Sequence, residues 1–232
     1  MPPRALEPAG VALVDKPVGP SSFAVVAQIR RVTKARTGHA GTLDPFASGL
    51  LLVLSGRATK LAPCLVGLDK RYTTEIDLTT RTSTGDPEGE VVSQSAPPTR
   101  DELEQRLAAL RGEIELPIPA ASAVKIGGER AYRLARRGVQ VEMPMRRSTV
   151  HALDVIAYTG EPGAVERVQL DLRVSSGTYV RAIADALGGH CVALRRTEVG
   201  PFSVADAVAP EAFEASRLLG EDVVRRGVEA RA

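Results

Sequence analysis

Strand-like and helix-like segments follow one another along this chain without a regular order. Residues 50–54 are continuously apolar, and residues 168–174 alternate in the strand period. A further alternating strand covers residues 71–80, with one side formed by Tyr72, Thr74, Ile76 and Leu78. Because a doubly wound parallel sheet needs a repeating βαβ succession, the irregular order favours an α+β fold.

A first helix is expected over residues 23–32. Either Ser21 or Ser22 can cap its N-terminus, since a serine hydroxyl accepts a hydrogen bond from a free backbone N–H. At helical spacing, four residues fall near one face, and these are Phe23, Val26, Ile29 and Arg30.

Turn and capping signals mark the remaining segments. Residues 82–98 are polar and rich in turn formers, which predicts a surface hairpin or loop. Thr99 and Glu102 form a capping box for a helix that we expect to stop at Gly112. A short basic helix over residues 129–137 is expected to end at Gly138, and a helix over residues 179–187 at Gly188.

The composition is that of an ordinary globular protein. The 232 residues are 44% hydrophobic and 25% charged, which argues against disorder. Cys64 and Cys191 lie in no CxxC or CxH pattern, so we expect buried free thiols and neither a disulfide framework nor a structural zinc. No apolar run reaches about 18 residues, and the first ten residues lack a signal-peptide pattern, so we expect a cytoplasmic location.

The net charge of +2 conceals a segregation of charge. Residues 16–81 carry ten Lys or Arg against four Asp or Glu, and residues 125–147 carry seven against two. Residues 82–120 carry eight acidic residues against three basic ones. Arg accounts for 25 of the 30 basic residues, and its planar guanidinium suits phosphates and bases. The basic segments therefore indicate either a nucleic-acid surface or a solvated basic face.

Residues 39–49 combine a carboxylate with loop formers. Two glycines and a proline place Asp44 on a shaped loop just before an apolar run, where a scaffold can present a reactive side chain. The alternative is that Asp44-Pro45 caps a following helix. One His and one Asp without a second acidic cluster do not make a metal site, and neither a phosphate loop nor a GxSxG elbow is present.

Six ordered stretches of this chain match one family. The first contains His39-x-Gly41-x-Leu43-Asp44-Pro45-x-Ala47-x-Gly49-x-Leu51 and then Gly56-x-x-Thr59-Lys60. The others are Asp15-Lys16-Pro17-x-Gly19-x-Ser21-Ser22, Asp69-Lys70-Arg71-Tyr72, Ser122-Ala123-Val124-Lys125 with Tyr132 and Ala135-Arg136, Gly177-Thr178-Tyr179-Val180-Arg181, and Leu194-Arg195-Arg196. Over about residues 10–206, the chain thus resembles the bacterial pseudouridine synthases of the TruB family.

The resemblance implies a domain organisation. It implies the pseudouridine synthase catalytic fold over residues 1–206, with a mixed, largely antiparallel sheet flanked by helices. A basic RNA-binding insertion is implied at residues 122–150, and a short C-terminal extension at residues 207–232. Family members commonly end in a PUA domain that binds RNA, and we expect a short form without a complete one, either natural or truncated. The loop at Gly189 is shorter than usual in the family, so substrate contacts from that loop are not carried over.

The reaction that the resemblance implies is the isomerisation of uridine 55 in the tRNA T-loop to pseudouridine, without a cofactor. Asp44 is implied as the nucleophile, and an Asp with an ordinary pKa of about 3.9 is ionised at pH 7. Arg181 is implied as its ion-pair partner, with phosphate binding or a surface helix position as alternatives. Tyr72 is implied to stack on the flipped base and to have a part in moving the C5 proton, with a place in the core as the alternative.

Other residues are implied to bind the substrate. Tyr179 and Leu194 resemble further pocket residues, and His39 resembles the histidine near the displaced nucleotide, with a purely structural histidine as the alternative. Lys125 and Arg136 belong to the basic insertion, which closes on the T-loop in the family and in which guanidinium groups can hold phosphates. The implied partner is the T-arm of tRNA. We expect no metal and no membrane association, and a monomer.

Two functions are compatible with such a surface. An RNA-isomerising enzyme and a tRNA-binding folding factor would share the same basic face. The set of Asp44, Tyr72 and Arg181 favours the enzyme, because a protein that only binds RNA would not require it. A hydrolase or a metal-dependent nuclease is disfavoured, since the chain offers neither a triad signature nor a ligand set.

Overall fold

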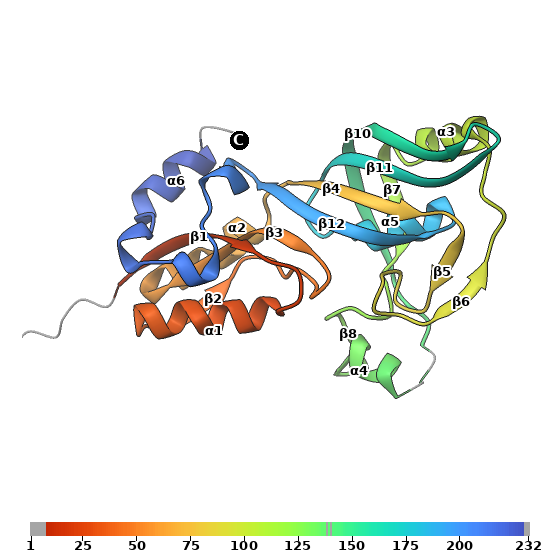
Figure 1. Cartoon of the computed structure of the whole chain (residues 1–232). Coiled ribbons are helices and arrows are strands. Elements are labelled where there is room, and N and C mark those ends of the chain that lie inside the picture. Colours follow the sequence, from red (N-terminus) through yellow and green to blue (C-terminus); the bar gives the residue numbers. More distant parts are fainter. Residues whose placement is uncertain (1–7, 138, 140, 230–232) are drawn as a thin grey trace, which may run out of the picture. The chain divides into compact units, whose positions relative to one another are not determined.

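The computed structural model describes residues 8–137, 139 and 141–229 (Figure 1). The chain divides into two compact units. The first contains the chain up to Tyr72 together with the residues from Arg195 onward, and the second contains Thr73–Leu194. Strands β4 (Lys70–Asp77) and β12 (His190–Val199) contribute residues to both units.

The first unit is built around strand β3 (Ser48–Ser55). This strand pairs antiparallel with β1 (Gly10–Lys16) and with β2 (Thr37–His39), and in parallel with β12. The helices are α1 (Ser22–Thr33), α2 (Ala62–Val66) and α6 (Glu221–Glu229). The remaining elements are strand β13 (Phe202–Ser203) and the 3-10 helices η1 (Gly56–Leu61), η2 (Val204–Asp206), η3 (Pro210–Ala212) and η4 (Ala215–Arg217).

Alternate residues of β3 enter two different hydrophobic clusters. Leu50, Leu52 and Leu54 pack in one cluster with residues of η1, α2 and α6. Leu51 and Val53 pack in the other with residues of α1. Because both faces of the strand are covered, every position must be apolar, which confirms the buried segment expected at residues 50–54.

Helix α1 confirms its predicted cap but not its predicted face. The Ser21 hydroxyl accepts a hydrogen bond from the N–H of Ala24 at 3.2 Å. The prediction that Phe23 shares a face with Val26 and Ile29 is wrong, because Phe23 is 77% exposed. Successive helical residues are rotated by about 100°, and the buried stripe runs through Ser22, Val25, Val26, Ile29 and Thr33.

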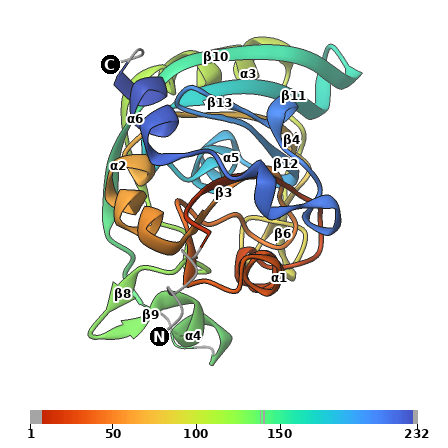
Figure 2. The same cartoon turned by 90° about the vertical axis from the view of Figure 1, so that its left-hand side faces the viewer.

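The second unit contains a sheet in the order β12, β4, β11 (Ala164–Val174), β10 (Met145–Glu161) and β7 (Gly112–Pro117). Strand β10 is antiparallel to both of its neighbours. Helix α5 (Val180–Leu187) contacts α3 (Arg100–Ala109) and β7. Two small hairpins complete the unit, β5 (Thr80–Thr82) with β6 (Val91–Gln94) and β8 (Lys125–Ile126) with β9 (Glu129–Arg130). Helix α4 (Ala131–Arg136) follows β9 directly (Figure 2).

Most of the expected helix ends are confirmed. The Thr99 hydroxyl accepts from the N–H of Glu102 at 3.3 Å, and the Glu102 carboxylate accepts from the N–H of Thr99 at 2.8 Å, as in a capping box. Helix α3 ends at Ala109, and Gly112 begins β7. Gly188 ends α5 with a left-handed φ of 99°. The predicted stop at Gly138 lies outside the described residues.

The two cysteines differ in exposure. Cys191 is buried in β12, as expected, but the expectation is wrong for Cys64, which is exposed. Cys64 lies on α2, a helix of five residues that buries only Leu65. No helix within the described ranges is long and apolar enough to cross a membrane.

Candidate active site

Asp44 lies in a half-buried position on the loop between β2 and β3. A turn follows it, in which the N–H of Ala47 donates to the carbonyl of Asp44 at 3.1 Å. The chain then enters strand β3 at Ser48, so the alternative that Asp44-Pro45 caps a helix is wrong. The carboxylate is therefore carried by a tight loop at the entrance to the most buried strand of the first unit.

Lys16 holds the second half of this loop. Its side chain is completely buried, and its Nζ donates to the carbonyls of Pro17 at 2.9 Å, Pro45 at 3.3 Å and Ala47 at 2.6 Å. Three acceptors satisfy the donors of a buried ammonium group, which would otherwise be costly to bury. This lysine thus fixes the loop backbone on the C-terminal side of Asp44.

Ser22 holds the residue just before the nucleophile candidate. Its buried hydroxyl accepts a hydrogen bond from the N–H of Leu43 and donates one to the carbonyl of the same residue, both at 2.8 Å. Because Ser22 begins α1, the position of Leu43 is tied to the helix.

Arg196 holds the first half of the loop. Its side chain is 1% exposed, and its guanidinium donates to three carbonyls, those of Leu50 at 2.8 Å, Gly41 at 3.1 Å and Thr42 at 3.4 Å. Together with Lys16 and Ser22, it attaches the Asp44 loop to β1, α1 and β12. Such support from buried side chains keeps a reactive group in one geometry.

Gly49 allows β12 to approach the end of this loop. Its φ is +102°, and an added Cβ would lie 2.2 Å from the carbonyl oxygen of Arg196. Glycine is required here, because it has no Cβ to disfavour the positive φ or to collide with the backbone of Arg196. Gly49 pairs with Arg196 across the parallel strands β3 and β12.

His39 ends strand β2 beside the loop. Burial lowers the pKa of its imidazole, the charge of Arg196 lowers it further, and a hydrogen bond with the backbone of Gly41 opposes both effects. The imidazole is therefore held mainly neutral at pH 7. Its half-buried position is compatible both with contact to a nucleotide and with the structural alternative.

Tyr72 and Lys70 lie on the buried side of β4. Tyr72 is 8% exposed, and the alternation of buried and open positions along β4 confirms the predicted strand. The Lys70 ammonium donates to the carbonyls of Val66 and Leu68. Burial lowers the pKa of Lys70 to about 8, with a further lowering by Arg196 and a smaller opposing effect of Asp69.

Arg181 lies in the first turn of α5 and is 4% exposed, so the alternative of a surface position is wrong. It donates to the carbonyl of Thr84 at 2.8 Å, to the carboxylate of Asp86 at 3.1 Å and to the carbonyl of Ala121 at 2.9 Å. The Asp86 carboxylate is itself buried, and it accepts from the Thr84 hydroxyl and the N–H of Glu88. This is a buried ion pair with additional hydrogen bonds on both partners.

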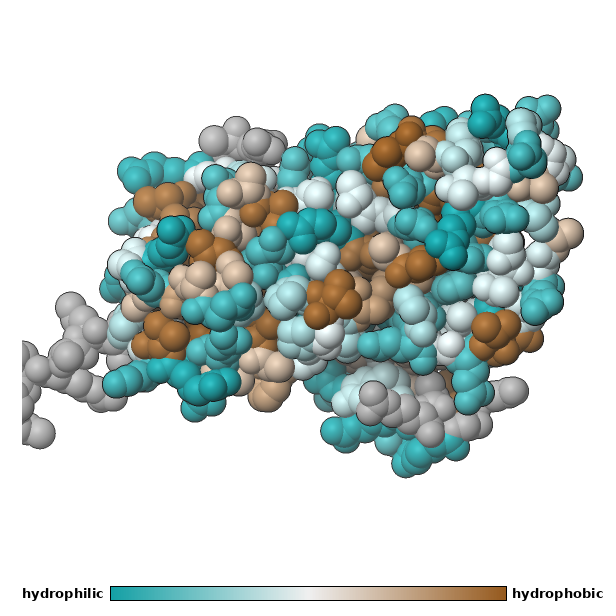
Figure 3. All heavy atoms as spheres, in the orientation of Figure 1, coloured by the Kyte–Doolittle hydropathy of each residue, from teal (hydrophilic) through white to brown (hydrophobic). Residues whose placement is uncertain are grey.

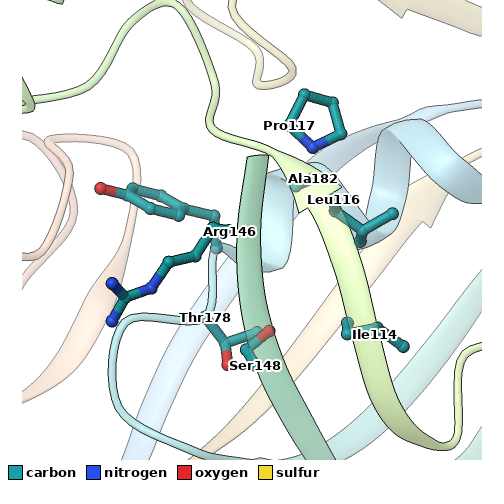
Figure 4. Close-up of a pocket in the computed structure, with 8 residues that line it drawn as sticks. Ile114, Leu116, Pro117, Arg146, Ser148, Thr178 and Ala182 are labelled. Carbon is teal, nitrogen blue, oxygen red and sulfur yellow. The ribbon is translucent and has the colours of Figure 1, made fainter. Parts of the chain in front are cut away.

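Tyr179 is the N-cap residue of α5 and lines a small pocket of the second unit (Figure 4). The other lining residues are Ile114, Leu116, Pro117, Arg146, Ser148, Thr178 and Ala182. The Arg146 side chain extends on the side of β10 that faces away from Leu116 (Figure 4). Arg146 also packs on Gly177, at which an added Cβ would lie 2.3 Å from Nη2. The pocket therefore combines an aromatic ring with a cation.

The other predicted substrate residues have less defined surroundings. Leu194 is 9% exposed on β12. Lys125 is exposed on β8, where it pairs with Arg130 of β9. Arg136 is the last residue of α4, and its side chain lies outside the described part of the structure. No group of three or more His, Cys, Asp or Glu among the described residues is placed to hold a metal ion.

The predicted catalytic and substrate-binding residues are divided between the units. The first unit contains His39, Asp44 and Tyr72, and the second contains Arg181 and Tyr179. The pairing of Asp44 with Arg181 stays a prediction. A family model described as "TruB family pseudouridylate synthase (N terminal domain)" matches residues 30–180, which is more than half of the chain.

The chain belongs to the TruB family.

Similar curated proteins agree with this assignment. The chain is 41% identical to the tRNA pseudouridine synthase B of Azoarcus sp. (strain BH72), over 95% of this chain and 75% of the relative. It is 45% identical to the protein of the same name from Arthrobacter sp. (strain FB24), over 85% of this chain and 68% of the relative. The resemblance inferred from the six motifs is thus confirmed.

Solved structures confirm the predicted fold. The chain is similar to one in a Cbf5-Nop10-Gar1 complex, with a TM-score of 0.62 and 30% identity over 84% of this chain and 50% of that one. It is also similar to one in an H/ACA RNP bound to a substrate RNA containing 2'-deoxyuridine, with a TM-score of 0.63 and 25% identity. This match covers 88% of this chain and 52% of that one. This TruB family chain spans about half the length of both.

Sequence reasoning missed the residues that support the site. Asp86 lies in a turn-rich segment that predicts only a surface hairpin or loop, and nothing in its local pattern indicates burial. Lys16 and Arg196 stand in TruB family motifs, but Lys16 donates to the carbonyl of Ala47, 31 residues away, and Arg196 donates to that of Leu50, 146 residues away. Such contacts become visible only once the strands are paired.

Proposed function

We propose that this chain isomerises uridine 55 in the T-loop of tRNA to pseudouridine, with Asp44 as the catalytic nucleophile. The names of the curated relatives support tRNA as the substrate. The observation that carries the proposal is the position of Asp44 on a loop held by Lys16, Ser22 and Arg196, in a member of the TruB family. A rigid loop suits a nucleophile that must meet one carbon atom.

The reaction exchanges one bond of the uridine for another. The bond from N1 to the sugar C1′ breaks, the bond from C5 to C1′ forms, the C5 proton leaves to a base, and N1 takes up a proton, so that the composition is unchanged. No oxidant, reductant or group donor is consumed. The Asp44 carboxylate can begin this sequence by attack on C1′, by addition to the uracil ring or by assisting formation of a glycal, and each route requires the ionised form.

Arg181 is assigned the role of keeping Asp44 ionised. A carboxylate covered by a flipped base loses water, which raises its pKa, and a cation beside it opposes this effect. The hydrogen bonds of Arg181 to Asp86, Thr84 and Ala121 support this role, because they hold its guanidinium in one orientation.

The remaining assignments concern the flipped base and the RNA. Removing a base from its stack costs a few kcal/mol, so the protein must supply new contacts. Tyr72 is assigned stacking on the uracil and transfer of the C5 proton. The base pocket is completed by His39, Tyr179 and Leu194, and phosphates are assigned to Lys125 and Arg136.

The proposed organisation follows from these roles. Residues 1–206 form the catalytic domain, residues 122–150 its RNA-binding insertion, and residues 207–232 a C-terminal extension. The proposed partner is the T-arm of tRNA, and the proposed enzyme is a cytoplasmic monomer that requires neither a cofactor nor a metal ion.

The test is incubation of the full chain with an unmodified tRNA transcript, followed by chemical labelling of pseudouridine and detection of the mass shift. We expect one labelled position in the T-loop for the wild type and none for Asp44→Asn. Binding of the transcript by Asp44→Asn should stay within several-fold of the wild type. Asp206→Asn removes an exposed carboxylate of the same unit and serves as the matched control.

The result also separates the two candidate functions. Binding of the transcript without formation of pseudouridine by the wild type would favour the tRNA-binding folding factor. Labelling at a position outside the T-loop would contradict the proposed site of modification, although the chain would still be an isomerase.

A further inference from the structure

The solvent-facing side of α1 has an exposed aromatic ring at its beginning. Phe23 is 77% exposed, which is the largest value among the exposed large hydrophobic residues that the structure describes. Val18, shortly before the helix, is 66% exposed. In a chain with only four Phe, four Tyr and no Trp, a ring in this position contributes nothing to either cluster of the first unit.

Basic side chains continue the same side of the helix. Arg30 follows Phe23 by seven residues, which places both on one face of α1, with Arg31 beside them. Lys34 is the C-cap residue at the end of the same helix. All three cations are exposed, and none of them forms an ion pair or a side-chain hydrogen bond with another described residue. At 1.5 Å per residue, the face extends about 16 Å from Phe23 to Lys34.

The surrounding sequence supplies no negative charge. Residues 16–43 contain five basic residues and no acidic residue. Basic side chains in a last helical turn also interact favourably with the helix dipole, but that effect does not account for an exposed ring in the first turn. Hydrophilic and hydrophobic groups are mixed over α1 in the space-filling view (Figure 3).

This face adjoins the loop that carries Asp44. Phe23 follows Ser22, whose hydroxyl binds Leu43, the residue before the nucleophile. On the other side, the N–H of Gly19 donates to the carbonyl of Pro45 at 2.8 Å, which places Val18 next to the same loop. A substrate held at Asp44 therefore has further segments within reach of α1.

We propose that Val18, Phe23, Arg30 and Lys34, here called the α1 face, bind a second segment of the RNA substrate. An unpaired base stacks on Phe23, and two phosphates of the same strand bind Arg30 and Lys34. The proposal rests on the proposed function, because it takes the substrate to be RNA. Stacking on an aromatic side chain beside basic groups is a common mode of binding single-stranded or looped RNA.

A protein partner fits this face less well. The buried centre of a protein interface is depleted of charged residues, and the whole interface covers about 800 Å² on each partner. The α1 face instead offers two isolated apolar side chains beside unpaired cations. Alternating contacts to a base and to phosphates satisfy both kinds of group.

The test measures the affinity of the full chain for an unmodified tRNA transcript at several salt concentrations. Phe23→Ala should raise the Kd at least fivefold, and Phe23→Trp should bind within twofold of the wild type or more tightly. Neutralising two phosphate contacts in Arg30→Gln/Lys34→Gln should lower the log-log salt slope by about 1.4 to 1.8. The matched control is Arg225→Gln/Arg226→Gln on α6, which removes the same charge from exposed positions of the same unit.

Wild-type values of both the Kd and the salt slope for the α1 variants would overturn the proposal. So would a change in self-association of Phe23→Ala without a change in RNA affinity. Equal losses of RNA affinity in the α1 and α6 double variants would show that only net charge matters, and this result would also overturn the proposal. The proposed function fails separately, if the wild type binds the transcript through α1 but forms no pseudouridine.

Discussion

Arg181 and Asp86 form a buried ion pair in the second unit, with 3.1 Å between Nη1 and Oδ2 and side chains that are 4% and 5% exposed. The two residues are 95 positions apart in the chain, so the pair joins the β5–β6 hairpin to the first turn of α5. Arg181 also donates to the carbonyls of Thr84 and Ala121, and Asp86 also accepts from the N–H of Glu88.

Asp86→Asn should strongly destabilise the chain. The substitution keeps the shape of the side chain but removes the negative charge of Asp86 from the buried ion pair, and breaking a buried pair typically costs about 3 to 5 kcal/mol. We expect a lower urea midpoint and, in the part of the sample that remains folded, a lower kcat, because the guanidinium is no longer held in one orientation.

An exposed pair on the same helix provides the control for Asp86→Asn. Arg81 and Asp185 lie 2.8 Å apart, with side chains 38% and 54% exposed, and such pairs contribute about 0 to 1 kcal/mol. Asp185→Asn should therefore change the urea midpoint little. Equal effects of the two substitutions would show that burial of the Asp86 pair has no special consequence.

Arg196→Lys should slow the reaction more than it weakens RNA binding. A lysine keeps the charge but cannot donate simultaneously to Gly41, Thr42 and Leu50 as the guanidinium does. A displacement of about 1 Å at a reacting group lowers rates about 100-fold, and we expect a loss of kcat of this order. Single-turnover kinetics and filter binding of a tRNA transcript measure the two effects separately.

Arg195→Lys is the matched control for that substitution. Arg195 is adjacent in the sequence, but its side chain is 40% exposed and pairs with Asp15 at 2.8 Å. It donates to no carbonyl of the Asp44 loop in the described structure. A loss of kcat in Arg195→Lys as large as in Arg196→Lys would contradict the role of Arg196 as a support of the loop.

Neighbouring serines at the start of α1 have separable roles. Ser21→Ala removes an N-cap and should cost about 1 kcal/mol of stability without slowing catalysis. Ser22→Ala leaves the buried N–H of Leu43 without its acceptor, at a cost of about 1 to 3 kcal/mol, and should also lower kcat because Leu43 precedes Asp44. Urea unfolding and single-turnover rates of both variants test this difference. An equal loss of kcat in Ser21→Ala and Ser22→Ala would contradict the prediction.

Local patterns predicted the elements of the fold well. The apolar run in β3, the alternation in β4 and the capping box of α3 each depend on neighbouring residues, so the sequence contains all the information required. The predicted face of α1 is wrong, because hydrophobicity groups Phe23 with Val26 and Ile29, which lie about 60° and about 120° away around the helix.

The site was only partly predictable for a related reason. Asp44, Tyr72 and Arg181 are predicted as catalytic residues because each stands in a short motif, and their roles stay predictions. The partners that hold the site come from distant segments, and a buried Asp86 in a polar turn has the same local sequence as an exposed one. Burial of a charged group depends on what packs over it, and that is a property of the tertiary structure.

Lys70 should make the stability of the chain depend on pH in the alkaline range. Burial lowers its pKa from 10.5 to about 8, so between these values the unfolded chain binds more protons than the folded one. The free energy of unfolding therefore rises with pH, by at most about 1.4 kcal/mol per pH unit, from about pH 8 upward. Below pH 8 the lysine is protonated in both states and contributes no slope.

Urea unfolding of the wild type and of Lys70→Met between pH 7.5 and 9.5 measures this dependence. The rise in stability should disappear in Lys70→Met and persist in Lys60→Met, which replaces an exposed lysine. The range stops at about pH 9.5 because burial and a hydrogen bond with Glu104 raise the pKa of Tyr158 to about 12. Above pH 10 that tyrosine keeps its proton only in the folded chain and contributes a slope of the opposite sign. Parallel curves for the wild type and Lys70→Met would show that the ammonium group of Lys70 is not desolvated.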